Sequence, residues 1–73
     1  MNELIERLKN EADELSEKYE KLGIFIDSKK FDTLDPYVRG QMVVQHQSML
    51  NYKWSLLNRV DYMEEQLKEQ VDE

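Results

Sequence analysis

Cysteine is absent from this chain of 73 residues, which contains one histidine, one proline and two glycines. Without cysteine the chain forms neither a disulfide nor a cysteine zinc site, and a single histidine cannot build a metal site alone. No apolar run approaches the roughly 18 residues of a membrane span, and residues 1–15 lack the apolar stretch of a signal peptide. We therefore expect a cytoplasmic protein that needs no cofactor and does not enter the membrane.

The chain is also short for an independent domain. A domain of this size buries only about 60% of the surface that its unfolded chain exposes. Because the composition excludes disulfides and metals, oligomerisation is the remaining usual source of added stability. We expect one domain, residues 1–73, that assembles into a homo-oligomer.

Basic charge is scarce, and the net charge is -6. Residues 1–17 carry six acids and two bases, and residues 61–73 carry six acids and one base. Residues 18–35 hold four of each, whereas residues 36–60 hold three bases and no acid. Binding to DNA needs a concentrated basic surface, so we expect none. The distribution is typical of a solvated surface; alternatively, an anionic partner meets the central part of the chain.

Apolar residues predict a first helix over about residues 2–28. They recur at alternating spacings of three and four, the heptad pattern of helices that pack side by side. The pattern breaks after Asp27, where turn-forming side chains predict a turn over residues 29–35. Phe31 and Leu34 are too apolar for an exposed loop, so we expect them to close that end of the core. The heptad positions are Ile5, Leu8, Ala12, Leu15, Tyr19, Leu22 and Ile26.

Asp35 and Pro36 predict the start of a second helix, which should run to about residue 68. Aspartate accepts hydrogen bonds from the free amides of a first turn, and the missing amide hydrogen of proline costs nothing there. With a rise of about 1.5 Å per residue, about a quarter of this longer helix should lack a partner within the chain. We expect another subunit to cover Val60, Met63 and Leu67. The assigned heptad positions are Met42, Gln45, Met49, Tyr52, Leu56, Arg59 or Val60, Met63 and Leu67.

Three side chains of the second helix need separate interpretation. Gln45 is assigned to a core position, where a polar residue usually fixes register or oligomeric state and alternatively contacts a ligand. We interpret His46 as an interface histidine whose hydrogen bonds are satisfied, and alternatively as a ligand. The positions of Tyr52, Trp54 and Tyr62 lie too far around the helix to form one face, so at least one of these side chains should point away from the core of the hairpin. Trp54 is the best candidate for a subunit contact. The predicted fold class is all-α: an antiparallel helical hairpin that assembles into a helical-bundle homo-oligomer.

Patterns typical of enzymes are missing. The sequence has no glycine-rich phosphate loop, no HExxH and no evident pair of nucleophile and base, so we predict that the protein is not an enzyme. Ser28, Lys29 and Lys30 stand at the end of the first helix. Lysines there favourably oppose the helix dipole, which explains them structurally; the functional alternative is contact with a phosphate.

Three sequence elements together indicate a family. They are the start ERLKNE, the pattern FIxSxxF over residues 25–31, and a following series of apolar and polar positions that ends at Val60. In this order the chain resembles a small phage-encoded helical-hairpin family that includes the anti-CBASS and anti-Thoeris sponges, which sequester cyclic nucleotide signals of bacterial immunity. The other matching positions are Leu15, Leu22, Leu34, Gln45, Met49, Tyr52, Leu56 and Arg59.

The resemblance implies an oligomer of hairpins, for which a hexamer is one candidate size. It also implies ligand pockets between subunits, where bases stack on planar side chains and basic or hydroxyl groups hold phosphates. It implies a phage immune-evasion protein in the cytoplasm of the bacterial host that binds cyclic oligonucleotide or cyclic ADP-ribose-type signals without cleaving them. Ala12 departs from the pattern, because sponge-type relatives often carry an aromatic residue there; this counts against a cyclic dinucleotide at that spot. The ligand-binding candidates are Arg7, Lys18, Tyr19, Ser28, Lys29, Lys30 and Arg39.

Two other classes of function stay open from the sequence. The acidic ends or the apolar part of the second helix would suit a small acidic phage protein that binds and inhibits a host protein through its helices. A purely structural coiled coil would self-associate stably and bind no ligand.

Overall fold

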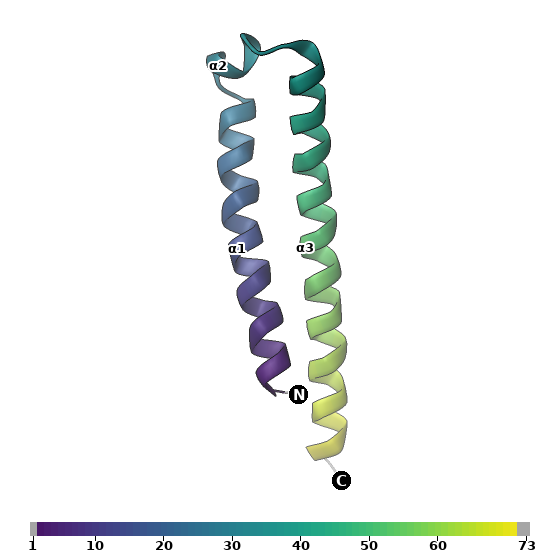
Figure 1. Cartoon of the computed structure of the whole chain (residues 1–73). Helices are drawn as coiled ribbons and strands as arrows, with labels where there is room; N and C mark the ends of the chain where they lie inside the picture. Colours follow the sequence, from purple (N-terminus) through teal and green to yellow (C-terminus); the bar gives the residue numbers. More distant parts are fainter. Residues whose placement is uncertain (1, 72–73) are drawn as a thin grey trace.

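Two long antiparallel helices make up nearly the whole molecule. The computed structural model describes residues 2–71, with the side chains of residues 2–69. Helix α1 spans Asn2–Ile26, the single-turn helix α2 spans Lys29–Asp32, and α3 spans Pro36–Val71. Figure 1 shows α1 and α3 side by side, with the start of α1 and the end of α3 at one end of the molecule and α2 at the other. The predicted all-α class and antiparallel hairpin are confirmed.

The core lies along the seam between α1 and α3. The seven heptad positions predicted for α1 are confirmed, because four are buried and the other three are half-buried. Leu56, 2% exposed, is the most enclosed side chain on α3. Each fully buried leucine or isoleucine contributes about 1.5–3 kcal/mol relative to its exposed state. The buried cluster consists of Ile5, Leu8, Ala12, Leu15, Leu56 and Val60.

The seam of α3 differs from the prediction at two core positions. Gln45 and Tyr52 are exposed, so their assignment to the core was wrong. His46 and Lys53, each one residue later, are half-buried in the seam instead. Both assignments alternate spacings of three and four, and histidine and lysine bury their apolar parts while their polar tips stay near water. A pattern based on apolar residues alone therefore placed these two seam positions one residue too early along α3.

The end of α3 is covered within the chain, contrary to prediction. Val60 is 3% exposed, and Met63 and Leu67 pack half-buried against the core cluster. Figure 1 shows α2 beyond the end of α1, at the level of the first turns of α3. Because α2 and the turn extend the first arm, α1 lies opposite the later part of α3. The expected overhang at these three residues was wrong.

The connection between the long helices is built by side-chain hydrogen bonds. Helix α1 ends at Ile26, two residues before the predicted end, and residues 29–35, predicted as a turn, include α2. The Ser28 hydroxyl donates to the Phe25 carbonyl (2.6 Å) and accepts from the Phe31 amide (3.4 Å), so Ser28 caps α2.

Two further contacts at this end match the sequence prediction. Phe31 is buried and meets Phe25 edge to face, with ring centroids 6.3 Å apart, and Leu34 is half-buried. The expectation that Phe31 and Leu34 close this end of the core is thereby confirmed. The Asp35 carboxylate accepts from the Tyr37 amide (2.9 Å), which confirms the predicted cap of α3.

Candidate functional site

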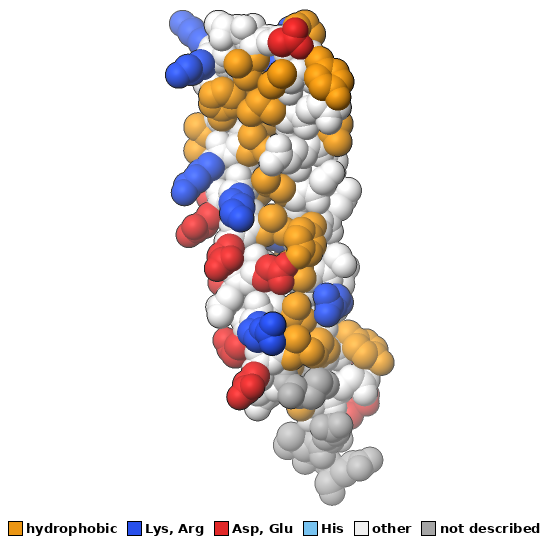
Figure 2. Space-filling model, viewed as in Figure 1, with side chains coloured by type: hydrophobic (Ala, Val, Ile, Leu, Met, Phe, Trp, Pro, Cys, Tyr) orange, Lys and Arg blue, Asp and Glu red, His pale blue; other side chains and the backbone are white. Residues whose placement is uncertain are grey.

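Four of the seven predicted ligand-binding residues lie at the turn end of the hairpin, which we define as residues 27–39. Lys29 and Lys30 are exposed on α2, directly after the capping residue Ser28. Arg39 is half-buried in the first turns of α3, and its Nε has no hydrogen-bond partner among the described residues. Figure 2 shows Lys or Arg side chains projecting at this end, beside a group of hydrophobic side chains. The turn end thus offers two exposed ammonium groups and the buried Nε of a half-buried arginine, unpaired within the described residues, to an anion.

The other three candidates lie along α1. Arg7 is exposed near the opposite end, about 30 Å from Lys29 at 1.5 Å per helical residue. Lys18 is exposed and Tyr19 half-buried, in the second half of α1. One small ligand therefore cannot contact Arg7 and Lys29 of the same chain.

Tyr19 already has a partner within the hairpin. Its ring stacks on the His46 ring, with centroids 3.9 Å apart and planes 5° from parallel. His46 is thereby half-buried at the contact between α1 and α3. Its buried Nε2 has no hydrogen-bond partner among the described residues. The stack occupies one face of the Tyr19 ring, so this tyrosine has at most one face for a nucleobase.

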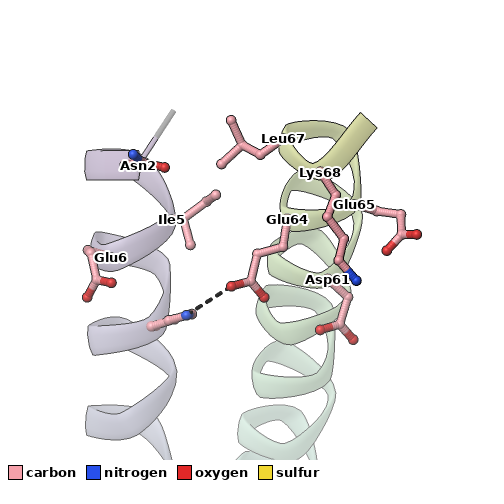
Figure 3. A pocket seen from close by; sticks show the side chains of 9 residues that line it. Asn2, Ile5, Glu6, Asp61, Glu64, Glu65, Leu67 and Lys68 are labelled. Carbon is pink, nitrogen blue, oxygen red and sulfur yellow. Dashed lines mark ion pairs between the residues drawn. The ribbon is translucent and has the colours of Figure 1, made fainter. Parts of the chain in front are cut away.

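A wide pocket that sequence reasoning missed lies at the open end of the hairpin (Figure 3). Lys9 Nζ and Glu64 Oε2 form an ion pair across it at 3.0 Å. The hydrogen bond and the charge of Glu64 raise the pKa of Lys9 above 10.5. Glu6, Asp61 and Glu65 add carboxylates to the lining, which makes this pocket unfavourable for phosphates. Its other lining residues are Asn2, Ile5, Leu67 and Lys68.

A shallow depression lies on the outward surface of α3, away from α1. Trp54, 53% exposed, lines it, which confirms that this side chain points away from the hairpin core. The Lys53 ammonium lies 5.8 Å from the centroid of the Trp54 ring system. A subunit contact through Trp54 stays a prediction. The other lining residues are Asn51, Ser55, Asn58, Arg59, Tyr62 and Met63.

Comparison with protein families identifies the chain. The family model described as Sequestin matches residues 2–62. The chain belongs to the Sequestin family. The match includes all seven predicted ligand-binding residues, and the family name denotes sequestration, in agreement with the resemblance to hairpin sponges. No curated protein and no solved structure matched the chain.

Among residues 2–71, no three histidine, aspartate or glutamate side chains are grouped closely enough to hold a metal ion. No helix within the same residues is both long enough and apolar enough to cross a bilayer.

Proposed function

We propose that this Sequestin-family protein binds and sequesters a cyclic oligonucleotide or cyclic ADP-ribose-type signal of bacterial defence, without cleaving it. The family match over residues 2–62 carries the proposal, because the family is named for sequestration. The resemblance to phage sponges supports the class of ligand and the setting, an immune-evasion protein in the cytoplasm of the bacterial host.

Sequestration sets a demand on affinity that favours an oligomer. Holding a signal below the threshold of its effector at nanomolar affinity requires about 12 kcal/mol per site. The turn end of one hairpin is open to solvent, with Lys29 and Lys30 exposed, so its charges are screened by water. A pocket enclosed between subunits of a homo-oligomer would desolvate these contacts and strengthen them.

The residues of the turn end divide into two roles. Lys29, Lys30 and Arg39 would hold the phosphates, because each presents N–H donors with positive charge. The Ser28 hydroxyl already donates to Phe25 and accepts from Phe31, so its role would be to position the two lysines. Arg7 and Lys18 would join the same ligand only from another subunit.

The test is binding by the purified protein. A thermal-shift screen should cover cyclic dinucleotides, cyclic trinucleotides and cyclic ADP-ribose isomers, since a ligand at 100 times its dissociation constant adds about 2.7 kcal/mol per site. The Lys29→Ala/Lys30→Ala variant should bind the identified compound at least tenfold more weakly, and Lys68→Ala, at the opposite end, should bind it normally. Heat denaturation should release the nucleotide intact. A flat panel on the folded protein would overturn the proposal.

The second candidate is inhibition of a host protein. The net charge of residues 1–17 is -4, from six acids and two bases, and that of residues 61–73 is -5, from six acids and one base. Such ends suit a basic protein surface, and binding would weaken with salt. A pull-down partner that is lost at high salt, together with a flat nucleotide panel, would favour this function.

A further inference from the structure

The outward side of α3 carries a row of uncharged residues. In a chain of which 36% is charged, Lys53 is the only lysine, arginine, aspartate or glutamate between Gly40 and Asn58, and it lies in the seam with α1. The row alternates spacings of four and three, and all of its members are exposed. We call it the outer α3 row; its members are Tyr37, Gln41, Val44, Ser48, Asn51, Ser55, Asn58 and Tyr62.

Solvent alone does not explain this composition. In Asn2–Ile26 of α1, eleven of the 25 residues are charged, which is ordinary for a helix with one face in water. The outer α3 row instead exposes large side chains, with Tyr37 73%, Val44 58% and Tyr62 67% accessible. Depletion of charge with enrichment of aromatic side chains marks the centre of a protein interface. The outer α3 row therefore has the composition of a contact surface.

We propose that the outer α3 row binds the same row of a second copy of this chain, with the two α3 helices antiparallel. The two-fold axis would pass between Ser48 and Asn51. The spacings between successive members of the row have the same order from either end. Each member would therefore lie opposite a member of a second copy that runs in the reverse direction. Such self-complementarity is what an interface across a two-fold axis requires.

The pairs that this register creates are chemically matched. Tyr37 meets Tyr62 of the second copy at each end, where aromatic rings pack well and their hydroxyls reach water. Gln41 meets Asn58, and these amides both donate and accept hydrogen bonds. The pairs nearer the axis are Val44 with Ser55 and Ser48 with Asn51.

The shape of the surface supports the same register. The depression on α3 is lined by Asn51, Ser55, Asn58 and Tyr62, which form the second half of the row. In the antiparallel register the first half of the second copy lies opposite it. Tyr37 and Val44 of that copy would insert as knobs into this depression, and the same contact repeats on the other side of the axis.

Charge favours the antiparallel direction over the parallel one. Residues 61–69 carry four acids and one base. A parallel pair would bring these acidic segments together, which is repulsive. The antiparallel pair keeps the two acidic segments at opposite ends of the contact, so this repulsion is absent.

Single cysteine variants test the register directly, because the chain has no cysteine of its own. Tyr37→Cys and Tyr62→Cys are refolded together, oxidised, and examined by non-reducing electrophoresis and mass spectrometry. Antiparallel pairing should give at least tenfold more 37–62 cross-link than 37–37 or 62–62 cross-link, because identical positions would lie about 37 Å apart. Equal or dominant cross-links between identical positions, or none at all, would overturn the proposal.

A charge variant tests the same interface without cysteine. Asn51→Glu places two carboxylates beside the axis and should weaken self-association by at least tenfold in analytical ultracentrifugation, with helical content unchanged by circular dichroism. Asn10→Glu, at an exposed position of α1, is the matched control and should self-associate normally. Equal self-association of the two variants would overturn the proposal. None of these measurements involves a nucleotide, so their outcome is separate from that of the proposed function.

Discussion

The imidazole ring of His46 lies flat on the phenol ring of Tyr19, with the ring centroids 3.9 Å apart. Gly23, one turn further along α1, lies at the edge of the same imidazole, and a Cβ atom there would stand 3.0 Å from Nε2. The glycine therefore makes room for the histidine, and the tyrosine limits where the histidine can move. This layer sets how closely α1 and α3 approach.

Substituting the two glycines should change stability in opposite directions. A Cβ at Gly40 meets nothing within 4 Å, so Gly40→Ala should raise the free energy of unfolding by about 1 kcal/mol through helix propensity alone. Gly23→Ala gains the same propensity but crowds His46, and overpacking costs about 1–3 kcal/mol, so its net effect should be a loss of about 1 kcal/mol. Urea unfolding followed by circular dichroism measures both.

The cause of the Gly23→Ala loss has its own control. In a His46→Ala background the crowding is absent, so adding Gly23→Ala should stabilise by about as much as Gly40→Ala does in the natural sequence. A Gly23→Ala effect that is the same in both backgrounds would contradict the role assigned to His46.

Leu56 should be the most sensitive apolar position tested on α3. It is 2% exposed and contacts the core cluster, so Leu56→Ala should lower the free energy of unfolding by about 3 kcal/mol through lost burial and the cavity left behind. Leu50, half-buried outside that cluster, is the matched control and should lose about 1 kcal/mol as alanine. Equal losses in urea unfolding at one protein concentration would refute this account.

The sequence predicted the seam of α1 because its apolar residues occupy one face without ambiguity. For α3 two heptad assignments are compatible with the spacing. The sequence predicted the seam positions that both assignments share, such as Met49 and Leu56, and failed at the positions where they differ. At residues 45 and 46 and at 52 and 53, a polar or aromatic residue stands beside a histidine or lysine. Only the contact with α1, and above all the space at Gly23, determines which of them enters the seam.

The candidate site was predictable only in part. The sequence places Ser28, Lys29 and Lys30 together because they are adjacent, and the hairpin brings Arg39 to the same end. Arg7 lies near the other end, a separation that follows from the length of α1. The acidic pocket depends on the pairing of the first turns of α1 with the last turns of α3, which a sequence pattern does not specify.

Removal of the α3 cap should destabilise the hairpin. In Asp35→Ala the Tyr37 amide loses its acceptor at 2.9 Å, and the expected loss in the free energy of unfolding is about 1 kcal/mol. Asp32→Ala, at an exposed acid for which the described structure shows no side-chain hydrogen bond, should change stability by less than about 0.5 kcal/mol. Thermal unfolding measures the loss of stability in both variants. Equal losses would contradict a capping role for Asp35.

The ion pair at the open end should lose its stabilising effect as the solution becomes alkaline. The hydrogen bond with Glu64 and its charge raise the pKa of Lys9 above 10.5, so the stabilisation is fully present below that pH and is lost as pH rises through the raised pKa. Glu64→Gln should return the Lys9 pKa toward its ordinary value, measured by NMR titration of the lysine side chains. Glu65→Gln, beside the same pocket, should leave it raised; a Lys9 pKa that Glu64→Gln does not alter would contradict the pairing.

Ser28 should influence ligand binding through the position of α2, because both hydrogen-bonding functions of its hydroxyl are used within the chain. Ser28→Ala removes the cap and should weaken binding of the compound found in the nucleotide screen, while also lowering stability by about 1 kcal/mol. Ser28→Asn keeps a capping side chain but no hydroxyl, and it should restore both. If Asn restores stability and leaves binding weak, the hydroxyl itself contacts the ligand. Thr33→Ala removes the hydrogen bond from the Thr33 hydroxyl to the Lys30 carbonyl at the other end of α2. This variant tests whether the loss of any hydrogen bond in the turn weakens ligand binding as Ser28→Ala does.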